Sequence, residues 1–119
     1  MGHTFTNMNW IPLQSEAQLT EIREKSTRRP QLIFKHSTRC PTSSLVKNRL
    51  ERAQQPDSID FYYLDLLSYR PISNKIVEDF FVEHESPQVL LIKGGQCVYD
   101  ESHTGITMDD IVERVAEKP

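Results

Sequence analysis

Short apolar runs and amphipathic stretches alternate along the chain, separated by residues that favour turns or helix caps. Unbroken apolar runs indicate buried strands, whereas apolar residues three or four positions apart indicate one face of a helix. Helices are therefore predicted over residues 16–26, 41–53, 70–81 and 108–115. Strands are predicted over residues 31–35, 59–67, 88–93 and 96–100.

Turn and capping residues support these boundaries. Ser15 can cap the first helix with Gln18 completing a capping box, and Thr107 with Asp110 should begin the last helix. The dipeptide at residues 94–95, Gly-Gly, favours a tight hairpin, so the strand after it should return antiparallel. The apolar residues expected on the helix stripes include Ile72, Ile76, Val77, Phe80 and Phe81 in the third helix and Ile111, Val112 and Val115 in the last.

The element order α-β-α-β-α-β-β-α predicts the fold class. Alternating helices and strands imply a mixed sheet with helices on both faces, and a closing hairpin plus a last helix complete a thioredoxin-like α/β plan with a central four-stranded sheet. A chain of 119 residues without an internal repeat or linker suits one domain, residues 1–119. Within that domain, residues 1–9 are expected to form a poorly ordered N-terminal segment.

Composition narrows the function classes. The formal charge is −3 with lysine and arginine spread along the chain, and no apolar run approaches the ~20 residues that span a bilayer. Nucleic-acid and membrane partners are therefore not expected.

Residues 1–4 lack the features of a secretory signal, which predicts a cytoplasmic protein. No metal or cofactor is expected, because the cysteines and histidines show no ligand-like spacing and the glycines form no phosphate loop.

Cys40 is the candidate nucleophile because it follows a strand and begins a helix. A thiol attacks a disulfide only as a thiolate, and an ordinary cysteine with a pKa of about 8.5 is mostly protonated at neutral pH. The free N–H groups and the dipole of a helix N-terminus favour an anion there. Pro41 suits the first helical position, and Arg39 adds a positive charge. Lys35 and His36 are expected on the approach to the same corner.

The second thiol of a two-cysteine redox motif is replaced here by Ser43, so the motif is C-P-T-S. Two interpretations of Ser43 stay open: it donates a hydrogen bond to the Cys40 thiolate, or it only bonds to backbone in the first turn. The second cysteine, Cys97, follows the hairpin turn. It should lie at the far end of the sheet, beyond the reach of a disulfide with Cys40.

Pro87 directly precedes a central apolar strand, where a residue without an N–H is unusual. A cis bond from Ser86 to Pro87 would resolve this and would expose the backbone of Ser86 to an extended thiol ligand. The alternative is a trans proline that opens an edge strand. The return strand should bring His103 to the end of the sheet that carries Cys40, where it could meet the ligand; His84 and His3 are weaker candidates.

Four separated segments, residues 34–43, 70–74, 84–88 and 102–107, together resemble the YtxJ-like monothiol bacilliredoxins, in matching order. The resemblance implies a Firmicute cytosolic protein of thioredoxin-like fold, with Cys40 as the single active-site cysteine and Pro87 as the cis-proline. Thr42 and Thr104 depart from the pattern, because a bulkier apolar residue and an aromatic are usual there. These departures bear on ligand fit.

The function that the resemblance implies is removal of bacillithiol from S-bacillithiolated client proteins. Bacillithiol, a low-molecular-weight thiol, would be the exchanging co-substrate, and an outside thiol or reductase would regenerate Cys40. Two alternatives remain open. In one, the chain is a thioredoxin-fold binding or stress-adaptor module with a modifiable surface thiol. In the other, it is a dithiol reductase that uses Cys97. The sequence leaves the oligomeric state undetermined.

Overall fold

The structure is a computed structural model that describes residues 8–117. Its helices are α1 (Glu16–Lys25), α2 (Pro41–Arg52), α3 (Arg70–Phe80) and α4 (Met108–Ala116), with a short 3-10 turn η1 (His103–Gly105) before α4. Its strands are β1 (Ile11–Pro12), β2 (Gln31–His36), β3 (Asp60–Asp65), β4 (Gln88–Lys93) and β5 (Gln96–Ser102). The predicted helices and strands are all present.

The strands form one mixed sheet in the order β1-β3-β2-β4-β5. β1, β3 and β2 are parallel, whereas β4 is antiparallel to both β2 and β5. The prediction of four strands was therefore one short. The extra strand, β1, pairs Ile11 with Tyr62 and Pro12 with Tyr63 at the edge of the sheet. A two-residue strand is too short to show a period, and its proline is compatible with an edge.

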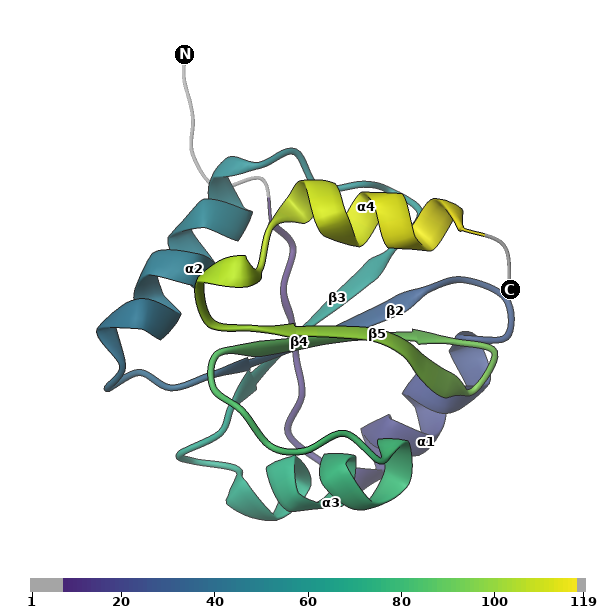
Figure 1. Ribbon diagram of the computed structural model, residues 1–119. Helices are drawn as coiled ribbons and strands as arrows, with labels where there is room; N and C mark the ends of the chain where they lie inside the picture. Colours follow the sequence, from purple (N-terminus) through teal and green to yellow (C-terminus); the bar gives the residue numbers. More distant parts are fainter. Residues whose placement is uncertain (1–7, 118–119) are drawn as a thin grey trace.

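Helices cover both faces of the sheet (Figure 1): α2 and α4 lie on one side, and α1 and α3 lie on the other. Each face has its own apolar core. Phe34 of β2 packs with Val46 of α2 and Ile111 of α4 on the first face. On the second face, Ile33 packs with residues of α1 and α3. The neighbours Ile33 and Phe34 enter opposite cores because successive side chains of a strand alternate between faces.

Two side chains expected on helix stripes are exposed instead. Val112 in α4 is 42% exposed, although its neighbour Ile111 is fully buried. Phe81 lies one residue beyond α3, with a left-handed φ of 58°, and is 91% exposed. The helix ends at Phe80, so the turn at Phe81 carries its ring away from the core.

The predicted caps of the first and last helices are confirmed. Gln18 accepts the backbone N–H of Ser15 at 3.1 Å in a capping box, and Thr107 accepts the backbone N–H of Asp110 at 3.1 Å.

The expected poorly ordered segment, residues 1–9, falls largely on residues 1–7, which lie outside the described residues. Of the two residues that are described, Met8 belongs to the core cluster on the α2 and α4 face. The backbone N–H of Asn9 donates to Gln55 Oε1 at 2.6 Å. Within residues 8–117, no helix combines the length and apolarity needed to cross a bilayer.

Candidate active site

Cys40 is the N-cap residue of α2, reached from β2 through a short turn. Its own N–H donates to the carbonyl of Ser37 at 3.1 Å, and its carbonyl accepts the N–H of Ser44 at 3.1 Å. Pro41 occupies the first helical position, where the missing N–H costs no helical hydrogen bond. The predicted strand-to-helix placement of Cys40 is therefore what the structure shows.

The surroundings of the Cys40 thiol suit a negative charge. The side chain is half-buried, and the first turn of α2 contains no acidic residue. Among residues 8–117, Cys40 Sγ makes no hydrogen bond of its own, so the free N–H groups of the first turn are available to a thiolate. Arg39 is exposed beside Cys40, and its backbone N–H donates to Ser37 Oγ at 3.4 Å.

Ser43 is fully buried in the first turn of α2. Its Oγ accepts the backbone N–H of Ser37 at 3.1 Å and lies 2.7 Å from Nδ1 of His36. Of the two open interpretations, the backbone contact is present and a hydrogen bond to Cys40 is not. Ser43 thus ties the turn that carries Cys40 to the end of β2.

His36 was expected near this corner, but its pairing with Ser43 was not predicted. The ring is 4% exposed and lies between Phe34 and Tyr63, with centroids 5.7 and 5.5 Å away. Burial, then the nearby Lys47 charge, lowers the pKa of His36 below 6.5. A spacing of seven residues across a strand, a turn and a helix start matches no helix or strand period, which is why the sequence carried no signal for the pair.

Lys35 and His36 are the last two residues of β2, on the approach to Cys40 as expected, but their side chains lie on opposite faces of the sheet. The Lys35 side chain is fully buried, and among residues 8–117 its Nζ has no hydrogen-bond partner. Burial lowers the pKa of Lys35 to about 8, although the charge of Glu85 opposes this shift. The alternation of β2 explains the placement, because Lys35 follows Phe34 and precedes His36.

The segment before β4 also lies at this end of the sheet. The Ser86–Pro87 peptide bond is cis, and Pro87 is buried. Lys35 pairs with Gln88 in the register of β2 and β4, which places Pro87 beside the exit from β2 towards Cys40. Ser86 Oγ is buried and finds no hydrogen-bond partner in the described part of the chain.

His103, the first residue of η1, follows β5 at the same end of the sheet. Its backbone N–H donates to the carbonyl of Pro87 at 3.0 Å, and its Nε2 lies 3.6 Å from Glu85 Oε1. Arg49 of α2 holds the following turn, because its guanidinium donates to the carbonyls of Thr104 at 2.8 Å and Ile106 at 2.9 Å. Figure 1 shows the start of α2, the turn η1 and the loop before β4 on the same side of the molecule.

A groove of about 440 Å³ opens between the loop before β4 and the end of β5. Gln88 and Ser102 contribute polar groups, and both Glu85 and His103 line it, so the groove adjoins the segment that carries Pro87. The remaining lining residues are Phe81, Val82, Glu83 and Asp100. The structure therefore brings the predicted site segments together and adds a groove that the sequence did not predict.

Cys97 lies at the opposite end of the sheet. It pairs with Ile92, whose partner on β2 is Gln31, the first residue of that strand, whereas Cys40 follows the last. Its Sγ donates to the carbonyl of Tyr99 at 3.3 Å, and burial raises the pKa of Cys97 to about 11. Both its position and its protonated state separate Cys97 from the chemistry of Cys40.

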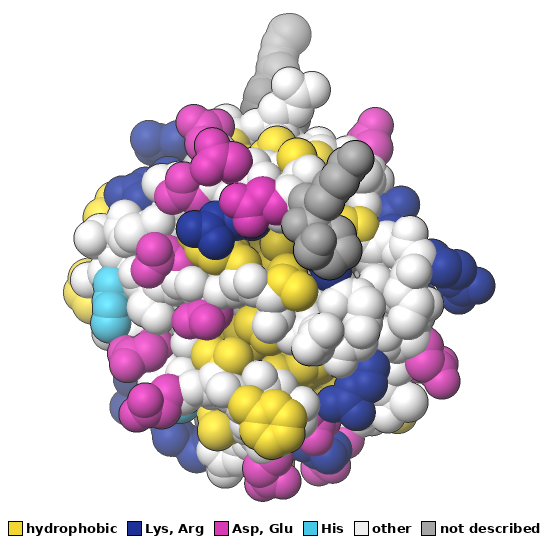
Figure 2. Space-filling view, turned by 45° about the vertical axis from the view of Figure 1, so that its right-hand side comes forward, with side chains coloured by type: hydrophobic (Ala, Val, Ile, Leu, Met, Phe, Trp, Pro, Cys, Tyr) yellow, Lys and Arg dark blue, Asp and Glu magenta, His cyan; other side chains and the backbone are white. Residues whose placement is uncertain are grey.

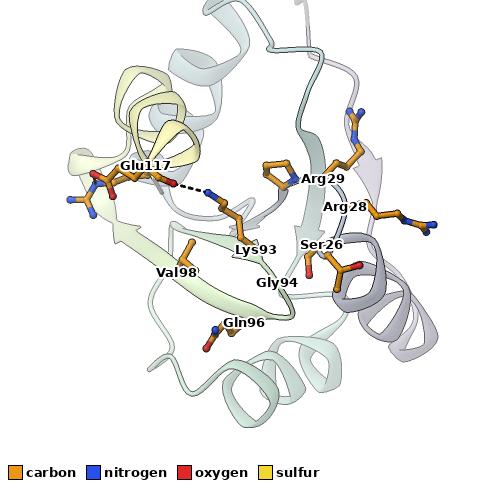
Figure 3. A pocket seen from close by; sticks show the side chains of 11 residues that line it. Ser26, Arg28, Arg29, Lys93, Gly94, Gln96, Val98 and Glu117 are labelled. Atoms are coloured by element: carbon orange, nitrogen blue, oxygen red, sulfur yellow. Dashed lines mark hydrogen bonds and ion pairs between the residues drawn. The ribbon is translucent and has the colours of Figure 1, made fainter. Parts of the chain in front are cut away.

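A hollow of about 500 Å³ lies far from Cys40, between the loop after α1, the β4–β5 hairpin and the end of α4 (Figure 3). Its cations are largely engaged: Arg29 lies 3.1 Å from Asp60, and Lys93 donates to the carbonyl of Glu117 at 3.1 Å.

The face in Figure 2 shows charges of both signs interspersed around apolar side chains. Within residues 8–117, no group of three potential ligand side chains could hold a metal ion.

Several solved structures share this fold. A provisionally assigned oxidoreductase with a thioredoxin fold is 27% identical, with a TM-score of 0.77 over 87% of this chain and 91% of that one. Thioredoxin from Malassezia sympodialis is 15% identical, with a TM-score of 0.72 over 94% and 93%. A thioredoxin variant from Halobacterium salinarum is 13% identical, with a TM-score of 0.71 over 98% and 99%. The last two likenesses establish the thioredoxin fold alone.

The model of the monothiol bacilliredoxin BrxC family matches residues 11–111. This match includes the strand-to-helix turn with Cys40, the segment with Pro87 and the turn with His103. It extends over most of the chain and agrees with the oxidoreductase neighbour of the same fold. The chain therefore belongs to the monothiol bacilliredoxin family and is a thiol oxidoreductase of thioredoxin fold.

Proposed function

We propose that this protein removes bacillithiol from client proteins that carry it as a mixed disulfide. The observation that carries the proposal is the position of Cys40, a half-buried thiol at the N-cap of α2 with no acidic residue in the first helical turn. The helix N-terminus stabilises the thiolate that must attack. Membership of the monothiol bacilliredoxin family supports bacillithiol as the exchanging thiol.

The first step is a thiol–disulfide exchange. The Cys40 thiolate attacks the bacillithiol sulfur of the mixed disulfide, a new S–S bond forms, and the client's bond to bacillithiol breaks. The client sulfur leaves with the electron pair and takes a proton from solvent. Cys40 then carries bacillithiol, and no net oxidation has occurred. The proposed role of bacillithiol is that of a co-substrate, with no bound cofactor.

The second step needs a thiol from outside the chain. Ser43 stands where a resolving cysteine would lie, and Cys97 lies at the other end of the sheet. The thiolate of a second bacillithiol or of a partner reductase must therefore attack the bacillithiol sulfur of the Cys40 adduct. This frees the Cys40 thiolate and leaves bacillithiol in a disulfide with the attacking thiol. This chemistry suits the reducing cytoplasm, which we propose as the location of the protein.

The groove beside Pro87 is the proposed approach for the extended part of the client or of bacillithiol. The backbone of Ser86 is the candidate for pairing with it, and His103 lines the groove within reach of Glu85. Arg39, exposed beside Cys40, supplies a positive charge at the entrance.

The test is removal of bacillithiol from a client protein, followed by intact-mass spectrometry of both proteins. The wild type should lower the client mass by one bacillithiol and gain that mass on Cys40. Cys40→Ser should release bacillithiol only at the background rate, whereas Cys97→Ser should retain wild-type activity. If Cys40→Ser worked at the wild-type rate, or if the wild type released nothing, the proposal would fail, and the second result would favour the adaptor module.

A further inference from the structure

The contact between His36 and Ser43 lies directly beneath the turn that carries Cys40. Ser43 is fully buried, His36 is 4% exposed, and 2.7 Å separates Nδ1 from Oγ. Ser43 lies three residues after Cys40, and residues three apart at a helix start share one face. The hydroxyl that could reach the Cys40 sulfur is therefore the hydroxyl that His36 already contacts.

The hydrogen atoms around Ser43 Oγ allow two arrangements. Ser37 donates its backbone N–H to this oxygen in both of them. If Nδ1 of His36 carries no proton, the only hydrogen available for the 2.7 Å contact is the hydroxyl hydrogen of Ser43, which then points at His36. If Nδ1 carries a proton, it donates to Oγ, and the hydroxyl hydrogen of Ser43 is free to point elsewhere.

We propose that His36 is a positioning residue for Cys40, which controls whether Ser43 can donate a hydrogen bond to the Cys40 thiolate. With Nδ1 unprotonated, His36 holds the hydroxyl proton away from the sulfur. With Nδ1 protonated, the Ser43 hydroxyl turns to the thiolate and stabilises it. This inference deepens the proposed function, because it assigns a control over the thiol on which that function rests.

The low pKa of His36 keeps its ring neutral at neutral pH, and we place the single ring proton on Nε2, which leaves Nδ1 to accept the Ser43 hydroxyl. Desolvation is the main cause of its low pKa, and the Lys47 charge on α2 acts in the same direction. Asp65 at the end of β3 and Glu51 on α2 oppose both. The Tyr63 ring lies against His36 from β3 and keeps its own proton, because burial raises the pKa of Tyr63. Lowering the pH should protonate His36 on both ring nitrogens, so that Nδ1 donates to Ser43 Oγ and the Ser43 hydroxyl hydrogen is free to turn to Cys40.

The experiment measures the rate of Cys40 alkylation by iodoacetamide across a pH series, in a Cys97→Ser background. His36→Phe keeps an aromatic ring but cannot accept the hydroxyl proton. At each pH below the midpoint of the Cys40 thiol titration, this variant should be alkylated about threefold to tenfold faster than the parent. The reason is that the freed Ser43 hydroxyl donates a hydrogen bond to the thiolate and raises the thiolate fraction. Adding Ser43→Ala should abolish this increase.

His36→Asn provides the conservative variant. Its side-chain oxygen can accept the Ser43 hydroxyl but cannot be protonated in this pH range. Its rate near neutral pH should match the parent, whereas the extra reactivity that the parent retains in acid should disappear. His84→Phe is the matched control, because the pKa of His84 is also lowered by burial, yet this residue contacts Ser73 of α3 instead. It should leave the alkylation profile unchanged.

The inference is overturned if His36→Phe and the parent have superimposable alkylation profiles, or if Ser43→Ala does not reverse the increase. A purely structural role for His36 would lower the thermal unfolding midpoint of the variants without moving the profile. Iodoacetamide reports on the thiol alone, so failure of bacillithiol transfer and failure of this control are separate results.

Discussion

At the scale of single residues, the least expected feature is the buried amine of Lys35. An unpaired ammonium in an apolar interior is costly because it loses hydration without gaining a hydrogen bond. Its Nζ has no partner among residues 8–117, and burial brings the pKa of Lys35 from 10.5 to about 8. At pH 7 Lys35 is therefore still mostly protonated in the folded protein, and this buried charge lowers the free energy of unfolding.

The substitution Lys35→Met should stabilise the protein at pH 7. The pKa of about 8, against 10.5 for an ordinary lysine, corresponds to a cost on the order of 3 kcal/mol. Between pH 8 and 10.5 the unfolded chain binds the Lys35 proton more tightly than the folded protein does. Wild-type stability should therefore rise as the pH is raised through this range, and the difference in unfolding free energy between the two proteins should narrow. Urea unfolding of both proteins at pH 7 and pH 9.5 measures this difference.

The control for this prediction is Lys25→Met, because Lys25 is exposed in the last turn of α1. It should leave the pH dependence of unfolding as in the wild type. A Lys35→Met protein that is less stable than the wild type at pH 7 would mean that the buried ammonium has a compensating partner.

At the scale of elements, the end of α3 illustrates what helix periodicity does not show. The apolar stripe runs on to Phe81, and this is why the helix was predicted to include that residue. The structure ends the helix at Phe80 and places Phe81 in the left-handed region, which normally favours glycine at this position. Two phenylalanines in a row gave no signal for this turn.

The substitution Phe81→Gly should make the protein more stable than Phe81→Ala does. Both variants remove a ring that is already 91% exposed, so they lose little apolar burial. Only glycine adopts a φ of 58° without the steric penalty of a Cβ atom. The left-handed conformation costs a residue with a Cβ about 1–2 kcal/mol, and the entropy of glycine offsets about 0.5–1 kcal/mol of this, so the expected net advantage is about 0.5–1 kcal/mol in the free energy of unfolding, measured with urea. Equal stability of the two variants would contradict the strain argument.

At the scale of the whole molecule, topology separates the two cysteines. Cys40 follows the end of β2, whereas Cys97 pairs with Ile92 near the hairpin, level with the start of β2. Six residues of strand lie between these levels. At about 3.3 Å per residue, this distance is far greater than a disulfide can bridge.

Mild oxidation of the purified protein should therefore yield no Cys40–Cys97 disulfide. Non-reducing peptide mapping by mass spectrometry checks this, and the Cys40→Ser variant provides the reference map. The expected oxidised species is a mixed disulfide on Cys40 with an added small thiol. Recovery of a peptide that links the two cysteines within one chain would restore the dithiol alternative.

Much of this architecture could be predicted because it depends on local patterns. The capping pair Ser15 and Gln18 set the start of α1, and the adjacent glycines set the β4–β5 hairpin with φ values of 60° and 82°. The strand β1 and the exposure of Val112 could not be predicted, because a two-residue strand has no period and a helix face is decided by what packs on it.

The thioredoxin order of elements and the placement of Cys40 at a helix start could both be predicted from local patterns in the chain. Both follow from interactions between residues close in the chain, such as capping, proline at the first helical position and apolar periodicity. The fold alone places His36 Nδ1 against the Ser43 hydroxyl, buries Lys35 on the opposite face of the sheet and opens a groove between the loop before β4 and the end of β5. These features depend on which faces of separate elements meet in space, and no local pattern encodes that meeting.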